Sequence, residues 1–119
     1  MESRFTQQLK KGVLEMVVLC IISEKDTYGY ELLQELGKRG EGFFDLKEGT
    51  LYPILYRLED DGLIQSSWKQ DPERNGGRRP APKKYYRITD AGSRAAEDYR
   101  DIWKKFEQCV DRLCGEEEV

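Results

Sequence analysis

The first part of the chain shows the three- and four-residue spacing of apolar side chains that marks one face of an α-helix. Between Phe5 and Ser23, apolar positions that recur at this spacing are Leu9, Val13, Met16, Val17, Cys20 and Ile21. A second, shorter series holds Tyr30, Leu33 and Leu36. The pattern predicts a helix over Phe5–Ser23, with this face turned inward, and another helix of about three turns after it.

The second predicted helix has recognisable candidates for its two ends. Asp26 and Thr27 precede the apolar series, and both residue types favour the N-cap, where a side-chain oxygen accepts from a backbone N–H. The glycines of segment 37–42 follow the series, as is common where a helix ends. We therefore expect one of these two polar residues to cap the second helix.

A third helix is predicted from Glu48 to Gly62. Its apolar face consists of Leu51, Ile54, Leu55 and Leu58. Pro53 is compatible with a helix if it falls in the first turn, as we expect here, and Gly62 supplies a left-handed cap.

The opposite face of this third helix carries side chains suited to nucleic acid. They are Thr50, Pro53 and Arg57, flanked by Tyr52 and Tyr56. A hydroxyl, two phenols and a guanidinium can contact phosphates, base edges and thymine methyl groups. Alternatively, Tyr52 and Tyr56 pack against the second helix or a later hairpin, and Arg57 pairs with Glu59 or Asp60.

Two segments of alternating side chains follow, Leu63–Lys69 and Lys83–Ile88. The residues between them, Gln70–Pro82, are rich in glycine, proline and charge, which predicts an antiparallel hairpin with a long tip. Because neighbours on a strand face opposite sides, we expect one of Tyr85 and Tyr86 to be buried.

Basic charge collects in this hairpin. The whole chain has a net charge of −3, but residues 69–87 hold seven basic and two acidic side chains, a local charge of +5. The remaining residues therefore carry −8. A basic arm on an acidic body favours contact with an anion such as the DNA backbone, and a solvated basic loop is the alternative.

A final apolar series predicts a helix over Ala91–Cys114, capped by Thr89 or Asp90. Its apolar residues alternate at four- and three-residue steps, the spacing of a coiled-coil seam. Such a helix is about 35 Å long, more than so small a domain can cover, so we expect a second copy to pack against it. The residues of this dimerisation stripe are Ala95, Tyr99, Ile102, Phe106, Cys109, Val110 and Leu113.

This order of elements predicts a mainly α fold of the α+β class: a winged helix-turn-helix of three helices, a two-stranded β-wing and a long C-terminal dimerisation helix. In such folds the third helix enters the major groove of DNA and the wing touches the adjacent backbone. The expected organisation is a DNA-binding domain over residues 1–89, a dimerisation helix over 90–115 and an acidic tail over 116–119.

Composition argues against an enzyme, a cofactor or a metal site. The chain has no histidine, the commonest general base and metal ligand, and no glycine-rich phosphate loop. Its cysteines, Cys20, Cys109 and Cys114, form no CxxC pair. Residues 1–11 have no long apolar segment and Met16–Ile22 is too short to span a bilayer, so we expect a cytoplasmic protein without membrane contact.

Four blocks together resemble the signature of the PadR family of transcriptional regulators. They are YGYEL at 28–32, EGTLYPILYRLE at 48–59, GLI at 62–64 and KYYRITDAG at 84–92. The resemblance implies a transcriptional regulator, usually a repressor. A dimer that holds two third helices about one turn of DNA apart would match an inverted repeat in double-stranded DNA.

Carried over by position, the resemblance places DNA contacts on the third helix, the start of the second helix and the wing. These residues are Tyr28, Thr50, Tyr52, Pro53, Tyr56, Arg57, Arg78, Arg79 and Lys83. A winged-helix module that binds an acidic protein through its basic hairpin, without sequence-specific DNA binding, is the alternative function.

The single C-terminal helix is similar to that of the compact, LmrR-like subfamily, which implies a planar aromatic effector bound at the dimer axis. The residues expected there are Leu9, Val13, Tyr99, Trp103, Phe106 and Glu107. Trp103 would stack on the ligand and Glu107 would attract a cationic one. The alternative is that Trp103 belongs to the dimer core and binds no ligand.

Overall fold

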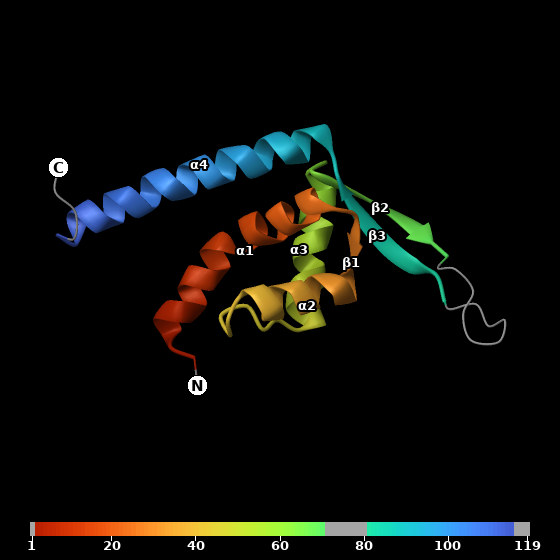
Figure 1. Cartoon of the computed structure of the whole chain (residues 1–119), viewed down its shortest axis with the longest axis horizontal. Coiled ribbons are helices and arrows are strands. Elements are labelled where there is room, and N and C mark those ends of the chain that lie inside the picture. Colours follow the sequence, from red (N-terminus) through yellow and green to blue (C-terminus); the bar gives the residue numbers. More distant parts are fainter. Residues whose placement is uncertain (1, 71–80, 116–119) are drawn as a thin grey trace.

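The structure is a computed structural model that describes residues 2–70 and 81–115. Its elements are α1 (Arg4–Glu24), β1 (Thr27–Tyr28), α2 (Gly29–Arg39), α3 (Glu48–Asp60), β2 (Ile64–Lys69), β3 (Lys83–Ile88) and α4 (Asp90–Leu113). Figure 1 shows the first three helices packed together, with the hairpin of β2 and β3 beside them and α4 running back along α1. The predicted wing residues Arg78 and Arg79 and the tail at 116–119 lie outside the described residues.

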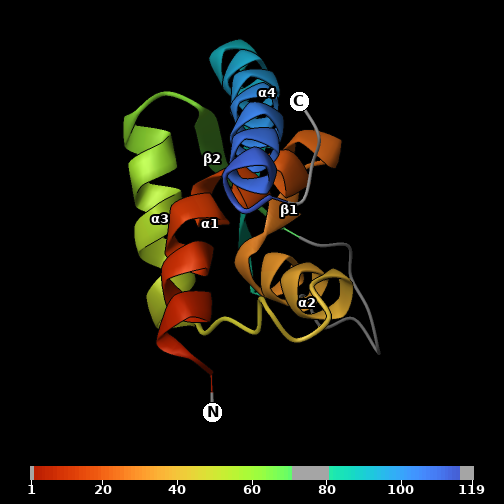
Figure 2. The same cartoon turned by 90° about the vertical axis from the view of Figure 1, so that its left-hand side faces the viewer.

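The core forms where the helices meet the sheet. Its buried apolar residues are Leu14, Val18, Leu19, Ile21, Ile22, Leu32, Leu36, Leu51, Ile54, Leu55, Leu58, Ile64, Tyr86 and Ala96. The predicted apolar face of α3 is buried in full, so its helical spacing is confirmed. Figure 2 shows α1 between α2 and α3, which explains why α1 contributes more buried residues to the core than any other element that the structure describes.

The face of α1 that we predicted to point inward is confirmed only in part: Ile21 is in the core and Val17 and Cys20 pack against it. Leu9 is exposed, and of the other predicted positions Ile21 is buried while the rest are half-buried. Helix α1 is apolar around much of its circumference, and the side that meets α2 and α3 carries Leu14, Val18 and Leu19 instead. The predicted face lies beside α4.

The predicted cap of α2 is also wrong. Thr27 is buried in a short strand, β1, where it pairs with Tyr86 of β3, and Tyr28 takes the N-cap position without a side-chain hydrogen bond. The Thr27 hydroxyl instead donates to Glu31 Oε1 at 2.6 Å. The antiparallel sheet therefore has three strands, in the order β1-β3-β2, where two were predicted.

The hairpin and the last helix follow the prediction. Strands β2 and β3 pair from Ile64 with Ile88 to Lys69 with Lys83, and Tyr86 is the buried tyrosine of its pair. Thr89 caps α4 by accepting from the Gly92 N–H at 3.0 Å. Within residues 2–70 and 81–115, no helix combines the length and the apolar composition that a bilayer span requires.

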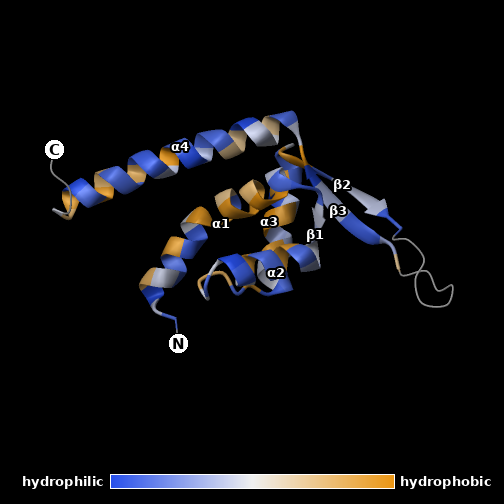
Figure 3. Cartoon of the chain, in the orientation of Figure 1, coloured by the Kyte–Doolittle hydropathy of each residue, from blue (hydrophilic) through white to orange (hydrophobic). Residues whose placement is uncertain are grey.

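The second half of α4 leaves the body of the molecule. Near its start Gly92 and Ala96 are buried, and Ala95 and Tyr99 pack against the core. Further along, Ile102 is 62% exposed and Phe106 is 60% exposed. Figure 3 shows hydrophobic residues recurring along this helix up to its end, so an apolar stripe faces solvent in the single chain.

Candidate nucleic-acid interface

The outward face of α3 carries the side chains predicted to contact DNA. Thr50, Pro53, Tyr56 and Arg57 are exposed, and Tyr56 is 65% exposed. Tyr52 of α3 is half-buried and packs against the start of α2. A Cβ added to Gly29 of α2 would lie only 2.3 Å from the Tyr52 hydroxyl oxygen. The packing alternative thus holds for Tyr52, whereas Tyr56 faces solvent.

Pro53 lies deeper in α3 than we predicted. Since α3 begins at Glu48, Pro53 is in its second turn and not its first, and the helix continues through it. Proline has no N–H to donate to the carbonyl four residues earlier, which here belongs to Gly49 at the exposed start of the helix. That carbonyl can bond to water, so the proline is tolerated.

Two lysines of the hairpin lie over tyrosine rings. Lys83 Nζ is 4.4 Å from the ring centre of Tyr28, and Lys84 Nζ is 5.8 Å from that of Tyr56. Tyr28 in turn meets the edge of Tyr85, with ring centres 5.3 Å apart. The Lys84 contact holds positive charge beside the exposed face of α3, whereas Lys83 lies with Tyr28 and Tyr85 on the opposite face of the sheet.

Lys84 was predicted as a wing residue suited to phosphate contacts, whereas Lys69 and Tyr85 were not predicted as DNA contacts. Lys69 Nζ lies 5.0 Å from the ring centre of Tyr85 and 3.4 Å from Asp26 Oδ2. The excess of basic residues in the hairpin was visible in the sequence, but the strand pairing decides which of them reach α3. Lys84 is the residue that connects the wing to Tyr56.

Arg57 is held by a different acid from those predicted. Its Nε donates to Oε1 of Glu15 on α1, in an ion pair between two helices. Glu59, one of the two predicted partners, accepts from the Ser66 N–H at 3.0 Å and from the Ser66 hydroxyl at 2.6 Å. Glu59 thereby ties α3 to β2.

Below this surface, Tyr86 supports both α3 and the sheet. Its burial, with smaller effects from the neighbouring Tyr52 and Glu59, raises the pKa of the Tyr86 phenol to about 12. A buried phenol resists ionisation because the phenolate would lose its hydration. Tyr86 is therefore a neutral packing residue under the exposed face, and not itself a phosphate contact.

Residues 18–98 match the family described as the transcriptional regulator PadR-like family. The chain belongs to this PadR-like family. A PadR-like transcriptional regulator from Bacillus cereus strain ATCC 14579 is 37% identical, with a TM-score of 0.72 over 90% of this chain and 96% of that one. Transcriptional regulator Rv3488 of Mycobacterium tuberculosis is 31% identical over 97 residues, 81% of each chain.

Transcriptional regulator YqjI of Escherichia coli strain K12 is 29% identical over 103 residues, which are 87% of this chain and 45% of that protein. The chain thus spans less than half of YqjI. The match confirms the predicted resemblance to PadR proteins and the winged-helix fold class. It places the chain among DNA-binding transcriptional regulators and not among enzymes.

In this PadR-like chain, five of the six residues predicted for an effector share one groove of about 540 Å³ between α1 and α4. These are Leu9, Val13, Tyr99, Trp103 and Phe106. Glu107 does not line this groove; the carboxylate that does is Glu15. Glu107 lies one turn after Trp103, on the face of α4 that meets a second groove.

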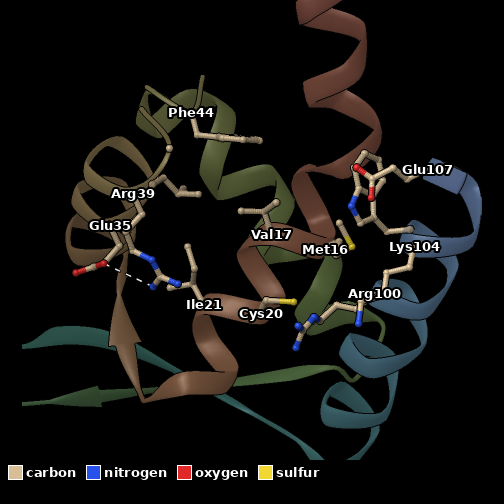
Figure 4. A pocket seen from close by; sticks show the side chains of 13 residues that line it. Met16, Val17, Cys20, Ile21, Glu35, Arg39, Phe44, Arg100, Lys104 and Glu107 are labelled. Carbon is tan, nitrogen blue, oxygen red and sulfur yellow. Dashed lines mark ion pairs between the residues drawn. The ribbon is translucent and has the colours of Figure 1, made fainter. Parts of the chain in front are cut away.

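Glu107 lines a second groove of about 470 Å³, between α1, α2 and α4 (Figure 4). Arg100 and Lys104 of α4 also line it, and Arg39 on the α2 side pairs with Glu35 at 3.7 Å. Burial raises the pKa of the Cys20 thiol at its floor. The residues that the structure describes contain no group of three acidic or thiol side chains able to hold a metal ion.

Proposed function

We propose that the chain is a repressor that binds an inverted repeat in duplex DNA as a homodimer, through the exposed face of α3 and the lysines of the hairpin. The observation that carries the proposal is the continuity of these two surfaces. Lys84 of β3 lies over Tyr56 of α3, so hydrogen-bonding side chains for base edges adjoin cations for phosphates.

The apolar stripe of α4 supports the dimer. Ile102, Phe106 and Leu113 are 62%, 60% and 82% exposed, an arrangement that is costly in water unless another surface covers it. A second copy offers the same stripe, and two identical patches can pack about a two-fold axis. In this proposal the helix at 90–115 is the dimerisation unit, and the two copies of α3 contact successive turns of DNA.

Binding to duplex DNA tests the α3 surface. Arg57→Ala is expected to weaken binding by about 1–3 kcal/mol, and Lys84→Ala to lower the slope of log affinity against log salt by about 1. Lys105→Ala, on α4, removes the same charge away from α3 and should change neither. If both substitutions leave DNA binding at low salt unchanged, the result contradicts the DNA-binding proposal and favours the alternative, a winged helix that binds a protein.

The groove beside α4 supports a planar aromatic effector. Trp103 is 36% exposed there, with Tyr99 and Phe106 on the same helix and Leu9 and Val13 opposite. A ligand that binds one arrangement of the two copies more tightly than the other would change the separation of the α3 helices and release DNA. The alternative, that the second copy fills the groove and Trp103 is a core residue, predicts no ligand.

Tryptophan fluorescence separates these two roles of the groove. A set of planar aromatic compounds is expected to include some that quench the wild-type emission in a saturable way. The Trp103→Ala variant, in which only Trp68 emits, should lose that quenching. If the variant is quenched as strongly as the wild type, the compounds bind elsewhere.

A further inference from the structure

Arg57, the one arginine on the exposed face of α3, is tied to a helix that is otherwise remote from the DNA contacts. Its Nε donates to Oε1 of Glu15 on α1, a residue 42 positions earlier in the chain. The acids next to it in sequence do not hold it: Glu59 bonds to Ser66, and no bond joins Asp60 to Arg57 in the described part of the chain.

The contact leaves the end of the arginine available. A guanidinium has five N–H donors, and Glu15 engages only the one on Nε. The Arg57 side chain is 59% exposed, and within residues 2–70 and 81–115 its two terminal nitrogens have no partner. The fork that recognises phosphate or guanine is therefore presented to solvent while the base of the side chain is fixed.

Glu15 is well placed to fix it. Its side chain is 38% exposed and lines the groove between α1 and α4, and the neighbouring Leu14 is buried in the core. Helix α1 also packs against α3. A carboxylate on a packed helix holds a long, flexible side chain more firmly than solvent does, and this lowers the entropy lost when DNA binds.

We propose that Glu15 is a positioning residue for DNA recognition, which holds Arg57 so that its terminal nitrogens meet the DNA. The inference rests on the proposed function and deepens it. It predicts that loss of the Glu15 carboxylate changes DNA affinity in the direction opposite to that expected from charge repulsion alone. Removing a carboxylate close to DNA phosphates should strengthen binding by reducing repulsion, whereas loss of a positioning contact should weaken it.

The test measures affinity for one duplex at one salt concentration in a set of variants. Glu15→Ala is expected to weaken binding about 5- to 10-fold, as is Glu15→Lys, although the latter adds a positive charge. Glu15→Gln keeps an acceptor for the Nε–H and should stay within about 2-fold of wild type. Glu97→Ala, an exposed acid on α4, is the control for a change of charge alone and should not weaken binding.

A double variant shows whether Glu15 acts through Arg57. In the Arg57→Ala background, Glu15→Ala should cause no further loss, because the side chain that it positions is absent. Thermal unfolding of each variant checks that the fold is kept, since a purely structural role would lower the stability together with the binding. If Glu15→Ala and Glu15→Lys bind as well as wild type while Arg57→Ala binds worse, the inference is wrong and the proposed function stands. If Arg57→Ala itself has no effect, the proposed function fails first.

Discussion

Three tyrosines between α3 and β3 show how much the surroundings of a residue decide what it does. Tyr86 is 3% exposed, Tyr52 is half-buried against the start of α2, and Tyr56 is 65% exposed. All three have the same phenol, yet only Tyr56 presents its ring and hydroxyl to solvent beside Lys84. Tyr86 and Tyr52 support the surface on which Tyr56 lies.

The buried phenol of Tyr86 makes the stability of the protein sensitive to alkaline pH. Its pKa is about 12 in the folded chain and about 10 in an unfolded one, because burial disfavours the phenolate. Its contribution to the free energy of unfolding is therefore full below about pH 10 and is lost as the pH rises towards 12. Denaturant unfolding at several pH values should show a steeper alkaline loss for wild type than for Tyr86→Phe. If the free energy of unfolding falls equally with pH in the two proteins, the Tyr86 phenol is exposed to water in the folded state.

Gly92, in the first turn of α4, is a position where a methyl group does not fit. A Cβ there would lie 1.9 Å from the backbone oxygen of Leu63, which cannot move aside as a side chain can. We expect Gly92→Ala to lower the free energy of unfolding by about 3 kcal/mol. Gly49→Ala, where nothing lies within 4 Å, is the matched control and should cause no loss. Similar unfolding curves for the two variants would contradict the close approach of α4 to Leu63.

At the scale of elements, the helices were the most predictable part of the molecule. The spacing of Leu51, Leu55 and Leu58 was enough to place α3 and its buried face, because a helix with one apolar stripe has one way to face a core. Helix α1 is apolar around more of its circumference, and its spacing alone did not show which side would meet α2 and α3. The tertiary contacts make that choice.

Apart from the position of Pro53 in α3, the missed features depend on contacts between distant segments. Strand β1 has only two residues, too few for any alternation, and Thr27 has the sequence appearance of a helix cap. The pairing of Arg57 with Glu15 and the exchange of Glu107 for Glu15 in the groove beside α4 follow from the direction of whole helices. No local pattern contains that information.

The exposed half of α4 gives a prediction at this scale. Phe106→Glu places a charge in the apolar stripe, and burying it against a second copy would be costly, so we expect this variant to be monomeric. Gln108→Glu introduces the same side chain at an exposed position outside the stripe and should leave the wild-type association unchanged. Sedimentation at micromolar concentration distinguishes the two. If the wild type is monomeric, or if Phe106→Glu is still a dimer, the apolar stripe of α4 does not form the dimer interface.

The whole molecule is elongated, with extents of 63 × 36 × 21 Å, because α4 extends beyond the three-helix body. Its charge is distributed unevenly as well. The chain carries −3 in total, yet residues 69–87 carry +5, and Lys84 of this segment lies beside α3, while carboxylates predominate elsewhere. An acidic protein can thus present a local basic surface to DNA, and its overall charge limits binding to other anions.

The central claim is that two copies, joined through α4, present two α3 faces to one DNA duplex. Selection of binding sequences from a random pool of duplexes by the purified wild-type protein tests it most directly. We predict enrichment of an inverted repeat whose half-sites are centred about 10 base pairs, or a multiple of that, apart. Arg57→Ala should fail to enrich it. Enrichment of a single unrepeated site, or of no sequence at all, would contradict the account.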